Sequence, residues 1–183
     1  MTKSIPRLKT KYETEVVPSL MQDLKIKNRY AVPKIVKVVV NMGVGSSTKD
    51  ENALTQAMND LSFITGQKPV VRKARISVAS FGVRKGTPVG LKVTLRRDRM
   101  YAFLDKLFSI VLPRLRDFRG LSLQSFDKEG GNYTLGIEDH SVFPEVDIAK
   151  SSAKGLEITI VTNAKDNKRA IKLLESLGMP FRK

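Results

Sequence analysis

Few residues in this chain of 183 have the chemistry of catalysts or metal ligands. There is one histidine, His140, and there is no cysteine, which excludes disulfide frameworks, thiolate zinc sites, thiol catalysis and iron–sulfur clusters. Glu138 and Asp139 precede His140, but a metal site usually needs three or four ligands. We therefore expect His140 to be a solvent-exposed loop residue, and we expect no metal and no catalytic residue.

A second candidate is the segment Gly43-Val44-Gly45-Ser46-Ser47-Thr48, which follows a predicted strand and precedes a predicted helix. This is the context of a dinucleotide fingerprint, yet the third glycine is missing and no Lys-Ser/Thr of a P-loop follows. The alternative is a sharp turn, since glycine adopts positive φ without steric cost. No Gly-x-Ser-x-Gly nucleophile motif occurs either. We expect a protein that is not an enzyme and has no cofactor and no small-molecule substrate. The alternative is an enzyme that uses residues 43–48 to bind a phosphate group.

The charge of the chain indicates a polyanionic partner. There are 33 Lys and Arg against 18 Asp and Glu, a net charge of +15, and the pI is near 10.1. Residues 68–99 alone hold ten Lys and Arg against Asp98. Nucleic acid is the leading candidate and an anionic membrane surface the second. The chain has neither a long apolar window nor the apolar segment of a signal peptide, so we expect a cytoplasmic protein without a membrane partner.

The stretch from Arg72 to Gly86 combines five cations and no acid with hydroxyls, glycines and Phe81. Cations and hydroxyls contact phosphate, glycines permit close approach, and a phenylalanine can stack on a base. The alternative is a long hairpin with Phe81 folded back into the core. We favour contact with RNA or DNA, because five uncompensated cations repel one another without a counter-anion.

Lys92, Thr94 and Arg96 recur at a period of two and therefore project from one face of a predicted strand. The strand lacks the aromatic stacking residues of the common single-strand-binding sheet module. A-form shape and backbone contacts fit this face better than base-by-base readout, so RNA is preferred to DNA. A nucleoid-type DNA-binding protein is the second alternative, since it would share the salt-sensitive attraction to phosphate.

Hydrophobic periodicity predicts the elements that must position these residues. Helical spacing predicts helices over 8–24, with a kink or division at Pro18, and over 51–65, 98–118 and 166–177. Apolar alternation and Val-rich runs predict strands at 34–42, 70–78, 89–96, 132–137 and 156–162. Such an order implies one sheet with helices packed on one face and the other face free to bind.

The chain carries a series of motifs, in order and over essentially its whole length, that resembles one known family. The motifs are Asn41-Met42-Gly43-Val44-Gly45, Gly66-Gln67-Lys68-Pro69, Lys73-Ala74-Arg75, Ser77-Val78-Ala79, Lys92-Val93-Thr94-Leu95-Arg96, Pro113-Arg114-Leu115-Arg116-Asp117-Phe118-Arg119-Gly120, Gly131-Asn132-Tyr133, Phe143-Pro144-Glu145 and Gly178-Met179-Pro180-Phe181-Arg182-Lys183. They resemble the bacterial form of the 5S rRNA-binding protein family of the large ribosomal subunit.

The resemblance implies an α+β fold with a mainly antiparallel sheet and a long basic loop. We expect a single domain over residues 1–183, with a flexible N-terminal extension at 1–7 and the loop at 72–88. Two departures from the family pattern stand out. Arg97 occupies a position where the family usually has glycine, and the loop from Phe126 to Gly131 is one residue longer.

The resemblance also implies a structural, non-enzymatic constituent of the large subunit that helps attach 5S rRNA in the central protuberance. The implied partners are 5S rRNA, large-subunit rRNA, P-site tRNA and a small-subunit head protein at an intersubunit bridge. The residues expected to bind 5S rRNA are Asn41, Gln67, Lys68, Lys92, Thr94 and Arg96. The residues expected to contact tRNA are Lys73, Arg75, Ser77, Arg84 and Lys85.

Overall fold

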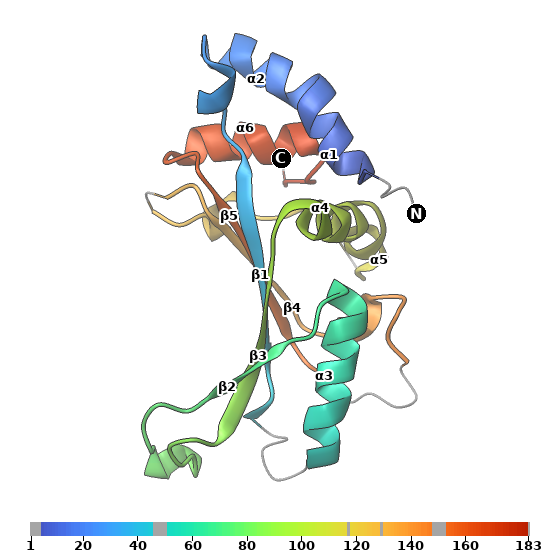
Figure 1. The fold of residues 1–183 in the computed structure, drawn as a ribbon, viewed down its shortest axis with the longest axis vertical. Helices are drawn as coiled ribbons and strands as arrows, with labels where there is room; N and C mark the ends of the chain where they lie inside the picture. The colour runs from blue at the N-terminus through green and yellow to red at the C-terminus, as the bar shows by residue number, and fades with distance from the viewer. Residues whose placement is uncertain (1–4, 46–50, 117, 129, 148–152, 183) are drawn as a thin grey trace. The chain divides into compact units, whose positions relative to one another are not determined.

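The computed structural model describes residues 5–45, 51–116, 118–128, 130–147 and 153–182. The strands form a five-stranded sheet with the strand order β2-β3-β1-β5-β4 (Figure 1). The elements are α1 (Arg7–Lys11), α2 (Val17–Asp23), β1 (Ile35–Gly43), α3 (Glu51–Thr65), β2 (Val70–Lys73), β3 (Pro88–Leu95), α4 (Arg97–Lys106), α5 (Leu112–Arg114), β4 (Tyr133–Ile137), β5 (Leu156–Thr162) and α6 (Asn167–Leu177).

The sheet is antiparallel, and the predicted α+β class is confirmed. β2 pairs antiparallel with β3, with Val70 opposite Lys92. β1 and β5 run in opposite directions as well, because Asn163 N–H donates to the Lys34 carbonyl near one end of the pair and Asn41 contacts Glu157 near the other. The predicted strand 156–162 is confirmed residue for residue.

Two compact units divide the chain. The first comprises Met1–Val38, Arg96–Leu135 and Thr159–Lys183, and the second comprises Val39–Leu95 and Gly136–Ile158. The assignment of residues 1–183 to one domain therefore stays a prediction. Within the described ranges, no helix is both long enough and apolar enough to cross a membrane.

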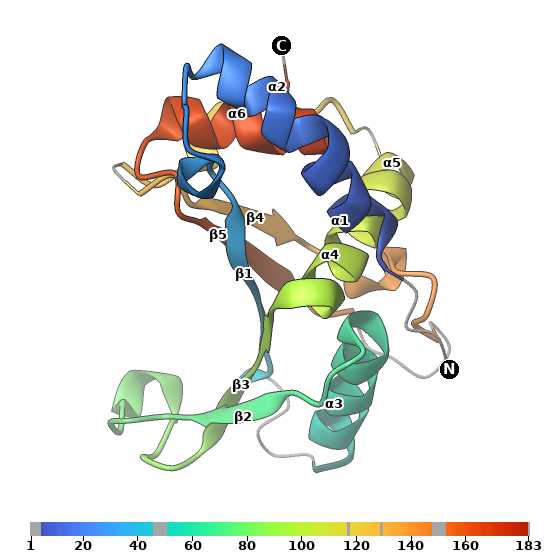
Figure 2. The ribbon, with the colours of Figure 1, turned by 45° about the horizontal axis from the view of Figure 1, so that its top comes forward.

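In the first unit, α1 packs against α4, and α6 packs against the turn that joins α1 to α2. Figures 1 and 2 show α1 and α2 lying beside α6. Arg7, the last residue of the predicted flexible extension, belongs to α1, and its guanidinium lies 2.6 Å from the Asp105 carboxylate. The rest of that prediction, residues 1–4, lies outside the described residues.

Both long helical segments of the first unit contain a π-helical turn just before a proline. Tyr12–Val16 precedes Pro18, and Leu107–Val111 precedes Pro113. Proline has no N–H to donate, and its ring clashes with the carbonyl four residues earlier. A π-helical turn, in which the hydrogen bonds span five residues and not four, accommodates this clash. The predicted division at Pro18 is confirmed. The predicted helix to residue 118 is wrong at its end, because helical structure stops at Arg114 and Leu115 is extended.

The second unit consists of α3, β2, β3 and the adjoining parts of β1, β4 and β5. α3 packs against β3 and ends at Gly66, whose φ of +65° is the left-handed cap that glycine favours. Its predicted N-cap, Asp50, lies outside the described residues. The positive φ expected at the glycines after β1 is absent, because neither Gly43 nor Gly45 has one, and Val44 N–H still bonds the Val89 carbonyl of β3. Whether the chain turns sharply here stays a prediction, because the segment continues beyond the described residues. Ser46, Ser47 and Thr48 lie outside the described residues.

Both departures from the family pattern have a structural consequence. Arg97 keeps the left-handed backbone of a glycine, with φ of +54°, a conformation that costs a residue with a Cβ about 1 kcal/mol. In the longer loop, Asp127 Oδ1 accepts from the N–H groups of Gly130 and Asn132, both at 3.0 Å. Burial raises the pKa of Asp127, but these hydrogen bonds together outweigh burial and lower it below its usual value.

Candidate nucleic-acid interface

The basic loop is built as a hairpin that extends β2 and β3, and residues 72–88 are called the basic hairpin below. The pairing shifts register between Arg72 and Lys73 but continues beyond the shift, where Lys73 pairs with Pro88 and Ala74 N–H donates to the Thr87 carbonyl at 2.9 Å. β2 itself ends at Lys73, so the predicted strand to residue 78 is too long. Pairing resumes near the tip, where Val78 and Val83 exchange two N–H to carbonyl bonds of 2.8 and 3.2 Å. Gly82, with φ of +62°, closes the tip.

The tip of the basic hairpin points away from α3 (Figures 1 and 2) and exposes apolar as well as charged side chains. Phe81 is 81% exposed and Ile76 is 71% exposed, so Phe81 is not folded back into the core. The Ser77 hydroxyl accepts from the Lys85 N–H at 2.9 Å. This bond shapes the tip and leaves the Ser77 proton available to donate.

The positive charge of the basic hairpin is not balanced by any ion pair with the described residues. All five cations of this hairpin are exposed, and none forms an ion pair with the described residues; they are Arg72, Lys73, Arg75, Arg84 and Lys85. Unpaired like charges repel one another and attract a polyanion from solution. The hairpin thus has the geometry and charge of a phosphate-contacting arm.

The sheet of the second unit has one buried face and one open face. Leu91, Val93 and Leu95 of β3 are at most 1% exposed, whereas Lys92 and Thr94, which alternate with them, are half-buried. The register of β2 places Arg72 opposite Gly90, and cross-strand partners share a face. Arg72 therefore joins Lys92 and Thr94 on the open face, as predicted for the latter two.

Gln67 is held against this face by the backbone of β3. Its side-chain amide donates to the Thr94 backbone carbonyl at 3.3 Å, and its backbone carbonyl accepts from the Thr65 hydroxyl at 3.1 Å. Lys68, the next residue, is exposed. The loop between α3 and β2 thus brings Gln67 beside Thr94.

Asn41 lies on the open face of β1, since Val40 and Met42 on either side of it are buried. Its amide donates to Glu157 Oε2 on β5 at 3.1 Å. This bond fixes the orientation of the amide and leaves Asn41 Oδ1 as an acceptor. It also places a carboxylate, which repels phosphate, at the β5 side of the open face.

Arg96 is the one predicted rRNA-contacting residue that falls in the first unit. It is exposed, follows β3 directly and has the extended backbone of the N-cap of α4. The other five residues, together with the tRNA-contacting set, belong to the second unit.

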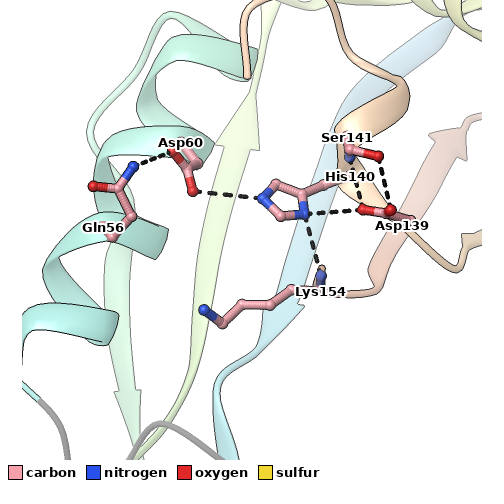
Figure 3. Close-up of polar contacts among 6 residues, drawn as sticks. All are labelled: Gln56, Asp60, Asp139, His140, Ser141 and Lys154. Atoms are coloured by element: carbon pink, nitrogen blue, oxygen red, sulfur yellow. Dashed lines mark hydrogen bonds and ion pairs between the residues drawn. The ribbon is translucent and has the colours of Figure 1, made fainter. Parts of the chain in front are cut away.

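His140 is buried, at 1% exposed, so the prediction of an exposed loop histidine is wrong. Figure 3 shows it enclosed between α3 and the segment around Asp139 and Lys154. Its Nδ1 accepts from the Lys154 N–H at 3.2 Å, and its Nε2 lies 3.5 Å from Asp60 Oδ2. Because Nδ1 is an acceptor, the proton on Nε2 is the one that points to Asp60.

Asp60 and Asp139 flank the imidazole, and each has further partners. Asp60 Oδ1 accepts from the Gln56 amide at 2.9 Å. The Ser141 backbone N–H and then its hydroxyl donate to Asp139, and these bonds lower the pKa of Asp139. Among the described residues, no group of three or more His, Cys, Asp and Glu is placed to hold a metal ion. The cluster is a buried hydrogen-bonded network that ties the segment after β4 to α3.

Three contacts in this region could not be predicted by the sequence analysis. Arg72 was not assigned to the open face, Glu157 was not seen beside Asn41, and Asp60 was not seen as the partner of His140. Strand alternation places a residue on one side of its own strand, but the sequence alone does not give the register between strands. The only signal in the sequence for the His140 contact is an aspartate, Asp60, within the predicted amphipathic helix 51–65.

An open sheet face with a protruding cationic hairpin, on an α+β framework, defines a nucleic-acid-binding protein. Comparison with known proteins narrows this class. The model for the C-terminus of the ribosomal L5 family matches residues 88–181, and the model described as ribosomal protein L5 matches residues 28–84. The chain belongs to the ribosomal protein L5 family.

Curated relatives extend the similarity over nearly the whole chain. The large ribosomal subunit protein uL5 of Caldanaerobacter subterraneus subsp. tengcongensis is 55% identical over 178 residues, which are 97% of this chain and 99% of that protein. The proteins of the same name from Chloroflexus aurantiacus and Dictyoglomus turgidum are each 54% identical over 177 residues, or 96% of this chain and 98% of each relative. The protein is therefore a structural, non-enzymatic constituent of the large ribosomal subunit, where it partners with ribosomal RNA.

Proposed function

We propose that the protein binds 5S rRNA through the open face of its sheet and helps attach that RNA in the central protuberance. The proposal assigns Asn41, Gln67, Lys68, Lys92, Thr94 and Arg96 to the contact. The observation that carries it is the placement of Lys92 and Thr94 on one half-buried face next to Gln67. The cations neutralise phosphates, and the Thr94 hydroxyl, which has no hydrogen-bond partner among the described residues, can donate to a ribose or phosphate oxygen.

We further propose that the basic hairpin contacts P-site tRNA through Lys73, Arg75, Ser77, Arg84 and Lys85. Two observations support this assignment: the cations are exposed and have no ion pair with the described residues, and the hydrogen bond from Lys85 N–H to the Ser77 hydroxyl orders the tip. The large-subunit rRNA and a small-subunit head protein, reached through another surface, complete the proposed set of partners.

A binding titration separates the two contacts. The wild-type chain is titrated with 5S rRNA in the presence of duplex DNA of equal length as competitor. The same titration is made with a variant whose hairpin is shortened by joining Lys73 to Pro88 through an Asn-Gly turn. We expect DNA in tenfold excess to leave 5S rRNA bound, because phosphate attraction alone does not specify a folded RNA. We expect the shortened variant to bind 5S rRNA as tightly as the wild type and to weaken P-site tRNA binding to ribosomes that contain it.

Complete displacement by DNA would reduce the interface to general polyanion affinity. Loss of 5S rRNA binding in the shortened variant, with its melting temperature unchanged, would contradict the division of labour between the sheet face and the hairpin.

A further inference from the structure

A second acid-free basic segment lies in the first unit, at residues 24–37. It holds five cations and no carboxylate, and none of these cations forms an ion pair with the described residues; they are Lys25, Lys27, Arg29, Lys34 and Lys37. Tyr30 lies in the middle of the segment and is 92% exposed. None of these residues belongs to the proposed 5S rRNA or tRNA contacts.

The backbone that carries Tyr30 is fixed, and residues 28–34 are called the Tyr30 turn below. Arg29–Ala31 form one 3₁₀ turn capped by Asn28, whose side-chain oxygen accepts from the Tyr30 N–H at 2.9 Å. The following residues, Val32 and Pro33, are buried. An exposed ring on such a turn needs little further ordering before it can bind.

Two elements outside the Tyr30 turn hold its far end. The Tyr12 hydroxyl donates to the Pro33 carbonyl at 3.0 Å. Lys34 N–H donates to Asn163 Oδ1 at 2.7 Å, and Asn163 N–H returns a bond of 3.1 Å to the Lys34 carbonyl. The turn is therefore anchored both to the π-helical turn after α1 and to the end of β5.

A hollow of about 160 Å³ lies beside the ring, with Glu13, Arg29, Tyr30 and Lys34 among its lining residues. Arg29 and Lys34 offer donors to phosphate. Glu13 is the one acidic residue of the lining; its carboxylate repels phosphate but accepts a hydrogen bond from a base amino group. The mixture suits a nucleotide whose base, rather than its phosphate, enters the hollow.

We propose that the Tyr30 turn is a further RNA-binding site, at which an unpaired base of ribosomal RNA stacks on the Tyr30 ring while Arg29 and Lys34 contact the flanking phosphates. The inference rests on the partnership with ribosomal RNA and adds a contact separate from the sheet face and the basic hairpin. Base–aromatic stacking between cations is the chemistry by which proteins hold unpaired nucleotides. Protein interfaces, by contrast, are depleted in lysine at their core, so the cations here favour RNA over a protein partner.

The chain offers a matched control in Phe63 of α3. Phe63 is also an exposed aromatic residue, at 68%, but the helix around it carries no cation between Glu51 and Thr65. The chain has no tryptophan, so Tyr30→Trp introduces a single indole that keeps a stacking surface and reports on it by fluorescence.

The test measures the affinity of full-length wild type, Tyr30→Ala, Tyr30→Trp and Phe63→Ala for 5S rRNA and for large-subunit rRNA, as separate probes at one salt concentration. We expect Tyr30→Ala to weaken binding to one of these RNAs about tenfold, the loss of one stacked base, with its melting temperature unchanged. We expect Tyr30→Trp to bind as the wild type does and its emission to be quenched by the same RNA. Phe63→Ala should behave as the wild type.

The inference is overturned if Tyr30→Ala binds both RNAs within about twofold of the wild type, or if the indole emission stays constant at saturating RNA. Unchanged RNA affinity with poorer incorporation into the large subunit would assign the turn to a protein partner and would equally overturn it. The variant Lys92→Ala/Thr94→Ala in the same assay separates the proposals. If this variant loses RNA affinity and Tyr30→Ala does not, only the inference about the Tyr30 turn is overturned. A wild-type chain that binds neither RNA would overturn both.

Discussion

The cations of α1 and those of the basic hairpin are the same residue types but differ in their ion pairing. Arg7 lies 2.6 Å from Asp105, and Lys9 lies 2.9 Å from Asp98, so these two α1 cations are paired within the first unit. The hairpin cations have no such partner among the described residues. Exposed pairs contribute little stability, but they remove charge from the surface. Unpaired like charges oppose folding through their mutual repulsion, which a bound polyanion relieves.

The polar cluster around His140 completes this comparison. His140 and Asp60 are buried and lie beside each other, and Asp139, which is partly exposed, accepts from Ser141. We infer from the difference that paired cations maintain the fold, whereas the cations without an ion-pair partner among the described residues contact RNA. Each of the following changes tests one side of that division, in order of decreasing expected effect.

The largest expected effect is on stability, for His140→Ala. The substitution leaves a cavity and removes the imidazole that faces Asp60 and accepts from Lys154, which should lower the free energy of unfolding by about 3 kcal/mol. Urea denaturation measures this loss. 5S rRNA affinity, measured well below the melting temperature, should stay within about twofold. Glu138→Ala, an exposed neighbour, is the control; a His140→Ala protein as stable as that control would break the comparison.

The next effect is on binding, for the double variant Lys92→Ala/Thr94→Ala. Removing two charge-assisted or hydroxyl contacts from the open face should weaken 5S rRNA binding by about 30-fold, or ~2 kcal/mol, with little change in melting temperature. The matched variant Arg7→Ala/Lys9→Ala also removes cations, but paired ones, and should bind like the wild type. Filter binding decides between them, and equal losses in the two variants would contradict the account.

Arg97 sharpens the comparison, because its backbone is held in the left-handed region with φ of +54°. Arg97→Gly should raise the free energy of unfolding by about 0.5 kcal/mol, since relief of the Cβ clash outweighs the greater freedom of glycine in the unfolded chain. Arg99→Gly in the regular part of α4 should instead lower it by about 1 kcal/mol. Thermal denaturation of both variants checks the signs; a destabilised Arg97→Gly protein would show that the conformation carries no strain.

The smallest expected effect concerns Glu157, the carboxylate next to Asn41 on the open face. Glu157→Gln removes the negative charge while its amide oxygen can still accept from Asn41, so 5S rRNA binding should tighten about two- to threefold at low salt and less at high salt. Glu138→Gln removes an exposed acid elsewhere in the second unit and should change affinity less. If Glu157→Gln weakens binding, the carboxylate contributes to the interface and the phosphates do not approach β5.

Much of the fold could be predicted from the sequence because its local signals agree with one another. The alternation in β3 separated the core from the open face, and the Gly66 and Gly178 caps ended α3 and α6 as expected. What the sequence could not give depends on contacts between distant segments. The buried His140 meets Asp60 of α3, which is distant in sequence, and the pairing of the hairpin shifts register between Arg72 and Lys73 without a local sequence pattern that predicts it.

The central claim, that unpaired cations are the ones that bind RNA, is tested most directly by the salt dependence of 5S rRNA affinity. The logarithm of the association constant is plotted against the logarithm of salt concentration for the wild type, Lys92→Ala and Arg7→Ala/Lys9→Ala. The account predicts that Lys92→Ala lowers the slope by about 1, the loss of one phosphate contact, and that the α1 variant keeps the wild-type slope. A slope that falls in the α1 variant and not in Lys92→Ala would contradict it.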